Sequence, residues 1–144
     1  MSTLNALEEK IKGAICPLPG PLARRFFEGK DVLVKFAGGR YRFLRKGHTL
    51  QLYDSDIRRI VGDGQIVDIF STDDLDSVWE KYSNRIFLTK KEFQSYSKHA
   101  PWGTRKWRTR KPSVSVFVLD KIRLYQEPTR LNRRMTPNLL YIRG

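Results

Sequence analysis

Hydrophobic residues in several segments of this chain recur at every second position, the spacing of a β-strand with one buried face. In DVLVKF, for example, Val32, Val34 and Phe36 fall on one face. The run VSVFVL is apolar on both faces, which is typical of a central strand, and the pattern allows it to continue past Asp120 to Leu124. The strands predicted in this way are residues 31–36, 49–53, 59–69, 114–119 and about 139–142. Residues up to about Ile15 are either a frayed start or a first strand.

Two later segments have helical spacing instead. Residues 73–85 place Leu75, Val78, Trp79 and Tyr82 on one face, with acidic residues at the start and basic residues at the end, as the helix dipole favours. Trp79 is therefore expected in the core. Thr89 and Glu92 have the spacing of a capping box for a second helix that carries Phe93 and Tyr96.

A short helix is also predicted over residues 22–27, with Arg24 and Arg25 facing outward. It follows CPLPGP at residues 16–21, where three prolines predict a break in regular structure. Residues 59–69 are predicted to form one or two strands, interrupted at Gly62 and Gly64, where glycine predicts a bulge or a close backbone approach.

These elements do not alternate regularly between strand and helix, which argues against a parallel sheet with crossover helices. We expect an α+β fold: a small, curled, mostly antiparallel sheet or barrel of five or six strands, with helices inserted between them. The 144 residues fit a single domain over residues 1–144.

Charge is the compositional outlier. The formal net charge is +13 and the isoelectric point is about 10.2, above the value of about 9 that marks a nucleic-acid-binding domain. An anionic membrane would attract the same charge, but no long apolar run and no basic amphipathic helix accompanies it, so no membrane partner is expected. Residues 1–13 contain acids and lack the apolar core of a secretory signal, and the single cysteine, Cys16, favours a reducing, cytoplasmic location.

The positive charge is densest in KHAPWGTRKWRTRK, residues 98–111, which contains no acidic residue. Trp102 and Trp107 lie among its lysines and arginines. Cations neutralise phosphates and flat aromatic faces stack on bases, so this composition fits a contact with single-stranded nucleic acid. A solvated basic loop between two structured segments is the alternative interpretation.

Motifs for other chemistry are missing. There is no P-loop and no glycine-rich dinucleotide motif, and we expect no cofactor. A calcium loop that begins at Asp54 would have Arg59 where glycine is needed and Gln65 where glutamate is needed. Cys16, His48 and His99 are too few and too scattered for zinc. We therefore expect no metal site, a structural thiol at Cys16, and surface histidines.

Several segments together resemble an uncharacterised, mainly archaeal family of PUA-like, ASCH-related proteins, a domain of unknown function. These segments are PLARRFFEGKDVLVKF (21–36), KGHTLQLYDSDIRRIVGDGQIVDI (46–69), RIFLTKKEFQSYS (85–97), SVFVLDKIRLYQEP (115–128) and RRMTPNLLYI (133–142). The resemblance implies a PUA-like/ASCH-like pseudobarrel with helices packed against a curled sheet. It also implies an association with nucleic acid, because PUA and related domains commonly bind RNA.

The match is incomplete in ways that matter for a site. His48 stands where ASCH-like domains usually have aspartate, and the GxKxxExR signature of true ASCH domains is absent. No catalytic residue is therefore transferred, and the fold alone does not assign a function.

The leading hypothesis is a module that binds structured or single-stranded RNA, with Trp107 and then Trp102 stacking on unpaired bases. Its expected nucleic-acid-binding residues are Arg40, Arg42, Arg45, Lys46, Arg58, Arg59, Trp102, Arg105, Lys106, Trp107, Arg108, Arg110 and Lys111. A hydrolase acting on a modified nucleoside or base, with Lys35, Tyr53 or Asp54 in its pocket, is the alternative. A third hypothesis is a protein-interaction role, for example on a ribosome or in another RNA–protein assembly.

Overall fold

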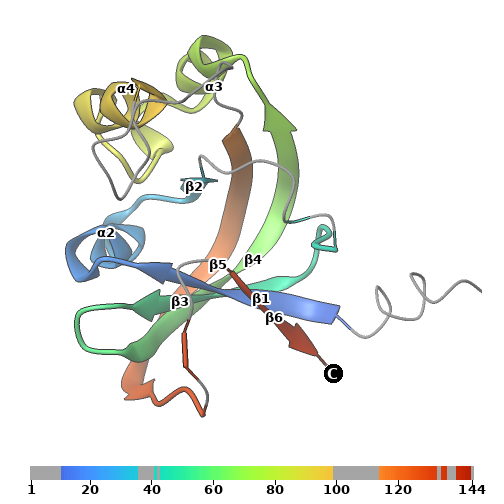
Figure 1. The fold of residues 1–144 in the computed structure, drawn as a ribbon, viewed down its shortest axis with the longest axis vertical. Helices are drawn as coiled ribbons and strands as arrows, with labels where there is room; N and C mark the ends of the chain where they lie inside the picture. Colours follow the sequence, from blue (N-terminus) through green and yellow to red (C-terminus); the bar gives the residue numbers. More distant parts are fainter. Residues whose placement is uncertain are drawn as a thin grey trace, which may run out of the picture.

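The computed structural model describes residues 11–35, 41, 43–98, 114–132, 134, 135 and 139–143, and in these residues a six-stranded sheet carries the fold (Figure 1). The order across the sheet is β2-β5-β4-β3-β1-β6, and every neighbouring pair is antiparallel except β1 and β3. The strands are β1 (Ile11–Leu18), β2 (Val32–Lys35), β3 (Thr49–Asp54), β4 (Arg59–Thr72), β5 (Val114–Thr129) and β6 (Leu140–Arg143).

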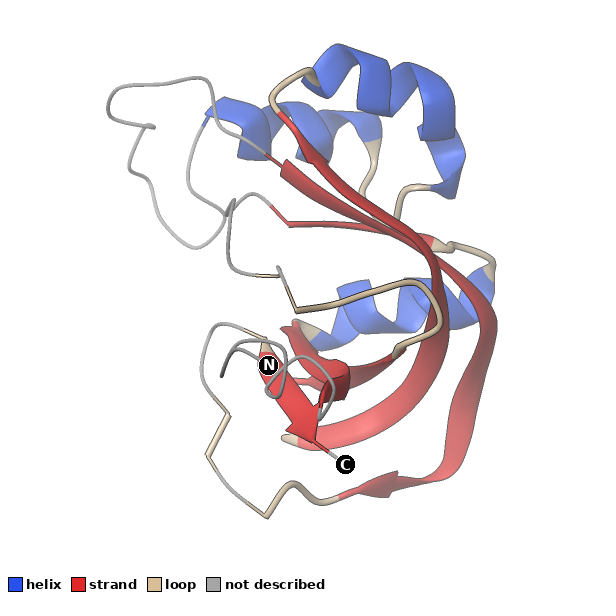
Figure 2. Ribbon diagram, turned by 90° about the vertical axis from the view of Figure 1, so that its right-hand side faces the viewer, coloured by secondary structure: helices blue, strands red, loops and turns tan. Residues whose placement is uncertain are grey.

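The two longest strands, β4 and β5, run the length of the molecule and bend the sheet (Figures 1 and 2). Their pairing register shifts between Ile60 and Gly62, between Asp63 and Gln65, and between Ile66 and Asp68. Such bulges bend a strand and increase its twist. The bulge expected near the two glycines is thus present, within one continuous strand. The sheet curls without closing, because its end strands β2 and β6 do not pair with each other.

The proline-rich break was predicted too early in the chain. Cys16, Pro17 and Leu18 belong to β1, and the strand ends only before Pro19. The reason is local: β6 pairs with β1 only from Ile11 to Ile15, so farther along β1 has a neighbour on one side alone. A proline is tolerated there because its missing N–H need not serve a second strand.

Helix α2 (Gly20–Arg25) continues into the 3-10 turn η1 (Phe26–Glu28) and connects β1 to β2. Arg24 is exposed as expected, but Arg25 is half-buried. Its Nη1 lies 2.6 Å from Oε1 of Glu92 and donates to the carbonyl oxygen of Phe87 at 2.9 Å. The outward prediction for Arg25 was wrong because a carboxylate on α4, distant in sequence, binds it.

The two later helices lie together at one end of β4 and β5 (Figure 1). Helix α3 (Leu75–Tyr82) is capped by Asp74, which accepts from the backbone N–H of Ser77, and it continues into η2 (Ser83–Arg85). Helix α4 (Lys90–Lys98) begins with the predicted capping box between Thr89 and Glu92. Trp79 is half-buried against the core, as expected of a core-facing residue, with its ring 5.4 Å from that of Phe93.

Two hydrophobic clusters lie on opposite faces of the β1–β3 part of the sheet. The main core holds Cys16 and Leu52, whereas their neighbours Ile15 and Tyr53 join Ile60 in a smaller cluster. This division follows from the alternation of side chains along a strand. Half-buried residues cover the smaller cluster: Tyr125 from β5, and Leu131, Met135, Leu140 and Ile142 from the chain after it.

Candidate functional site

Most of the residues predicted to bind nucleic acid lie outside the described residues. These are Arg40, Arg42, Trp102, Arg105, Lys106, Trp107, Arg108, Arg110 and Lys111. The structure places the other four, which are Arg45, Lys46, Arg58 and Arg59.

Arg45 and Lys46 are exposed in the turn that leads into β3. Lys46 reaches within 3.9 Å of Asp68, a long ion pair on the surface. His48 closes the turn by accepting the backbone N–H of Arg45 at its Nδ1. Partial burial, together with the positive charge of Arg45, lowers the pKa of His48. The neutral imidazole is therefore favoured, which suits its role as an acceptor.

Arg58 and Arg59 lie at the other end of β3: Arg58 ends the turn that connects it to β4, and Arg59 is the first residue of β4. Arg58 adopts a left-handed backbone with φ of 55°, and Nη1 of Arg59 donates to its carbonyl oxygen at 2.9 Å. The two predicted basic pairs thus sit at opposite ends of one strand. The described residues do not join them into a single patch.

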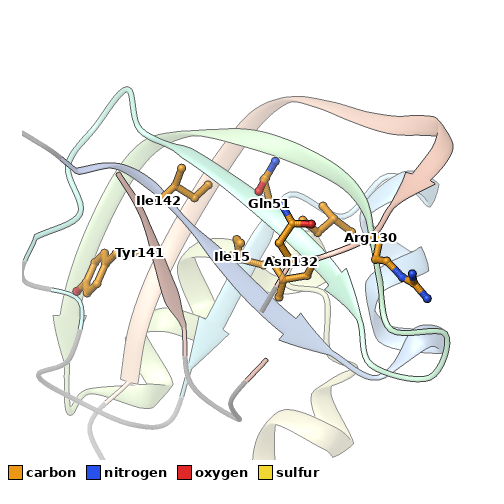
Figure 3. A pocket seen from close by; sticks show the side chains of 8 residues that line it. Ile15, Gln51, Arg130, Asn132, Tyr141 and Ile142 are labelled. Carbon is orange, nitrogen blue, oxygen red and sulfur yellow. The ribbon is translucent and has the colours of Figure 1, made fainter. Parts of the chain in front are cut away.

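A groove of about 440 Å³ opens on the sheet face that carries the smaller hydrophobic cluster. Its floor is apolar, and Gln51, Asn132 and Arg130 supply polar groups. Figure 3 draws Tyr141 at one end and Arg130 at the other, with Gln51 and Asn132 between them. The lining residues are Ile15, Gln51, Ile60, Arg130, Leu131, Asn132, Tyr141 and Ile142.

One arginine lines this groove, and three more lie close to its lining residues in the sequence. Arg130 lines it, Arg134 follows in the same segment, and the Arg58–Arg59 pair directly precedes Ile60 on its floor. Within the described part of the chain, none of these four forms an ion pair with a carboxylate. That part holds every acid except Glu8 and Glu9. Elsewhere arginines do bind carboxylates, as Arg85 binds Asp31 at 3.0 Å.

A network of hydrogen-bonded polar side chains is connected to the groove through Gln51. Asp63, only 6% exposed, accepts from Nε of Arg123 at 3.0 Å and from the hydroxyl of Tyr125 at 2.6 Å. The amide nitrogen of Gln51 donates to that same hydroxyl oxygen at 3.3 Å. Burial first, and then the hydrogen bond to Asp63, raises the pKa of Tyr125. The phenol of Tyr125 therefore keeps its proton, and the hydrogen bonds of the network have a fixed direction.

The three residues named for the hydrolase alternative do not share a pocket. Lys35 lies against Cys16, whose side chain is in the main core. Tyr53 belongs to the smaller cluster. The carboxylate of Asp54 accepts the backbone N–H groups of Asp56 and Ile57, which holds the β3–β4 turn. These contacts do not bring the three side chains together at one pocket where they could act on a common substrate.

Cys16 is fully buried, and burial raises the pKa of its thiol, an effect that Lys35 only partly opposes. A protonated, enclosed thiol is a poor nucleophile. Across the described ranges, no three or more His, Cys, Asp and Glu side chains group closely enough to hold a metal ion. Over the same ranges, no helix is long and apolar enough to cross a membrane.

The groove could not be predicted from the sequence. The sequence predicted a strand at residues 49–53, but its pattern could not show that the tail folds back over one of its faces. Arg130 and Arg134 follow the end of β5, and no local sequence pattern relates them to that face. The meeting of Arg130 with Ile15 of β1 and Gln51 of β3 depends on contacts across more than half of the chain.

Comparison with solved structures identifies the fold. An ASCH protein from Zymomonas mobilis is similar with a TM-score of 0.71 at 16% identity, over 92% of this chain and 88% of that one. A serine-to-alanine variant of that protein gives 0.72 at 15% identity, over 93% and 90%. The N-terminal domain of McrB from Staphylothermus marinus gives 0.55 at 12% identity, over 84% and 77%. The PUA-like, ASCH-like α+β fold implied by the sequence resemblance is thus confirmed.

Among curated proteins, none matches the sequence. One family profile matches residues 11–144, which is nearly the whole chain. The predicted kinship with an uncharacterised ASCH-related family is confirmed, and the chain belongs to the family described as a domain of unknown function, DUF365.

Proposed function

We propose that this protein binds RNA at single strands or loops, using the arginine-bordered groove together with the basic-aromatic segment at residues 98–111. The observation that carries the proposal is the groove itself. It combines an apolar floor with the polar side chains of Gln51, Asn132 and Arg130, and no described carboxylate neutralises Arg130. Phosphates and flat bases are the two features that such a surface complements.

RNA with unpaired bases suits this surface better than a duplex. Proteins recognise RNA sequence mostly in loops and single strands, whose bases splay out and become available for packing. A groove of about 440 Å³ lies in the size range of small-ligand pockets and so has room for one splayed nucleotide. Arginine is the preferred cation at such sites because its planar guanidinium pairs with phosphate through two hydrogen bonds.

The basic-aromatic segment supplies the second half of the proposal. It begins where α4 ends, at Lys98, and the chain returns to the sheet at Val114. Trp107 stacks on an unpaired base and Trp102 contributes second, while the neighbouring cations hold phosphates. Those cations are Arg105, Lys106, Arg108, Arg110 and Lys111, with Arg40, Arg42, Arg45 and Lys46 extending the positive surface.

The role of the groove in binding is tested by removing two positive charges from the segment beside it and, in a control, two positive charges elsewhere. Arg130 and Arg134 are replaced together by glutamine, and in a matched control Lys90 and Lys91, both exposed on α4, are replaced in the same way. Anisotropy of a labelled single-stranded RNA measures binding. The arginine pair should weaken binding at least several-fold more than the lysine pair. Equal losses would mean that only net charge matters, and the groove would then have no part in binding.

The segment is tested by Trp107→Ala and by the double substitution Arg108→Ala with Arg110→Ala. Loss of one stacking ring should cost about 1–3 kcal/mol of binding free energy. The same RNA titration at fixed salt provides the measurement. If both variants bind RNA like the parent, the role of the segment is refuted.

A further inference from the structure

The buried carboxylate of Asp63 fixes the direction of a chain of hydrogen bonds that ends in the groove. Asp63 faces the guanidinium of Arg123, with contacts of 3.0 and 3.1 Å to Nε and 3.0 Å to Nη2. A carboxylate paired with arginine only accepts hydrogen bonds. The hydroxyl of Tyr125, 2.6 Å from Asp63 Oδ2, must therefore donate its single proton to Asp63.

The next link follows from the first. With its proton committed to Asp63, the oxygen of Tyr125 can only accept from Gln51. The side chain of Gln51 therefore turns its NH₂ group to Tyr125, at 3.3 Å. Figure 3 shows the result: the amide nitrogen of Gln51 points away from Ile15, and the amide oxygen lies on the side toward it. The groove is thus offered an acceptor, Oε1, whose orientation does not depend on the ligand.

We propose that the groove is a nucleobase subsite in which Oε1 of Gln51 accepts a hydrogen bond from the exocyclic amino group of the base. This inference rests on the proposed function, since it names the part of the RNA that the groove takes. Cytosine and adenine carry such an amino group, whereas uracil has a carbonyl oxygen at the equivalent position of the pyrimidine. With uracil in the same orientation, two acceptors would face each other.

The remaining lining residues fit a base in this position. Ile15, Ile60 and Leu131 form an apolar surface for the flat face of the ring. Asn132, which is exposed at the rim, can turn its amide to present either a donor or an acceptor to a second edge atom. Arg130 lies at one end of the groove (Figure 3), and its guanidinium is suited to pair with a phosphate of the same nucleotide.

The relay makes Tyr125 a positioning residue that sets base preference without itself lining the groove. Tyr125→Phe removes the hydroxyl but keeps the ring and the ion pair between Asp63 and Arg123. The amide of Gln51 is then free to turn over and present its NH₂ group to the base. Discrimination between cytosine and uracil should fall while overall affinity changes little.

The test measures binding of labelled octamers of cytidine and of uridine to the full chain at one salt concentration. We expect the parent to favour the cytidine octamer about 10-fold, the value of one additional hydrogen bond. Tyr125→Phe should bring the ratio close to 1, and Gln51→Leu should do the same. Tyr53→Phe is the matched control, because Tyr53 lies in the same cluster but outside the relay, and it should keep the parental ratio.

Each outcome separates the two proposals. Tight and equal binding of both octamers by the parent would overturn the base subsite and leave RNA binding in place. A cytidine preference that survives both Tyr125→Phe and Gln51→Leu would place the selection elsewhere and refute the relay. Failure of the parent to bind either octamer would refute the proposed function itself. Circular dichroism melting of each variant confirms that any loss of preference occurs in a folded protein.

Discussion

A single glycine, Gly62, permits close packing between the bent sheet and the turn after α2. A Cβ atom at this position would overlap the carbonyl oxygen of Arg123 and would lie 2.5 Å from Cζ of Phe27. Real Cβ atoms do not approach other atoms so closely. The glycine is thus required by the two neighbours, and not by its own backbone angles.

Gly62→Ala should therefore destabilise the fold by about 1–3 kcal/mol, the usual cost of forcing extra volume into a packed site. Urea denaturation gives the free energy of unfolding. Gly64→Ala, two residues along the same strand, is the control: its nearest neighbours would be 3.2 and 3.3 Å away and belong to side chains. A Gly62 variant no less stable than the Gly64 variant would contradict the packing described here.

The stability of the fold at acid pH depends in part on the carboxylate of Glu92. Its hydrogen bond with Arg25, followed by that with the backbone of Thr89, lowers its pKa in the folded protein. The ionised form is thus favoured by folding, and the stability it contributes is complete above the unfolded pKa of about 4.3. That contribution disappears as the pH falls through the lower, folded pKa.

The parent should consequently lose more unfolding free energy between about pH 6 and pH 3 than Glu92→Gln does. At pH 6 the variant should be the less stable of the two, and at pH 3 the difference should shrink. Urea titrations at both pH values provide the comparison. Parallel pH profiles for the two proteins would show that the Arg25–Glu92 pair does not couple to protonation.

At the scale of elements, the start of α4 depends on a reciprocal cap. The backbone N–H of Thr89 donates to Oε1 of Glu92 at 2.8 Å, and the N–H of Glu92 donates to Oγ1 of Thr89 at 3.2 Å. Both donors would otherwise lack a partner in the first turn of the helix.

Thr89→Ala should cost about 1 kcal/mol of unfolding free energy, the typical value of a lost N-cap. Ser95→Ala, at an exposed position within the same helix, removes a hydroxyl without removing a cap and should leave stability nearly unchanged. Thermal and urea unfolding of both variants measure the difference. Equal effects would mean that the cap does not stabilise α4.

Elements whose signals are local could be predicted from the sequence. The capping box at Thr89, the buried run at residues 114–119 and the short strand near residue 140 all appear where their own residues indicate. Elements that depend on distant partners could not. Pro17 stays in β1 because β6 ends its pairing at Ile15, and Arg25 is drawn inward by Glu92, 67 residues away.

The same distinction between local signals and distant partners explains which parts of the candidate site could be predicted. Charge and aromatic content pointed to nucleic acid, and the basic residues at 98–111 were visible as one run. The groove was not, because Ile15, Gln51 and Leu131 are brought together only when the tail crosses β1 and β3. The relay through Tyr125 likewise requires the pairing of β4 with β5, which no local pattern specifies.

For the molecule as a whole, the net charge of +13 and the arginines around the groove are consistent with one polyanionic partner. Several arginines are already neutralised by carboxylates, including Arg25, Arg85 and Arg123. The positive charge of Arg58, Arg59, Arg130 and Arg134 is not balanced in this way by any acid of the described residues. Binding through that charge must release counterions and must therefore depend on salt.

The most direct measurement is the affinity of the parent protein for a single-stranded RNA, a stem-loop RNA and a duplex DNA at several salt concentrations. We predict preference for the two RNAs with unpaired bases. For the single strand, log affinity should fall with log salt at a slope of about −3.5, which corresponds to roughly five neutralised phosphates. Absence of binding at moderate salt would contradict the account, and so would equally tight binding of the duplex DNA.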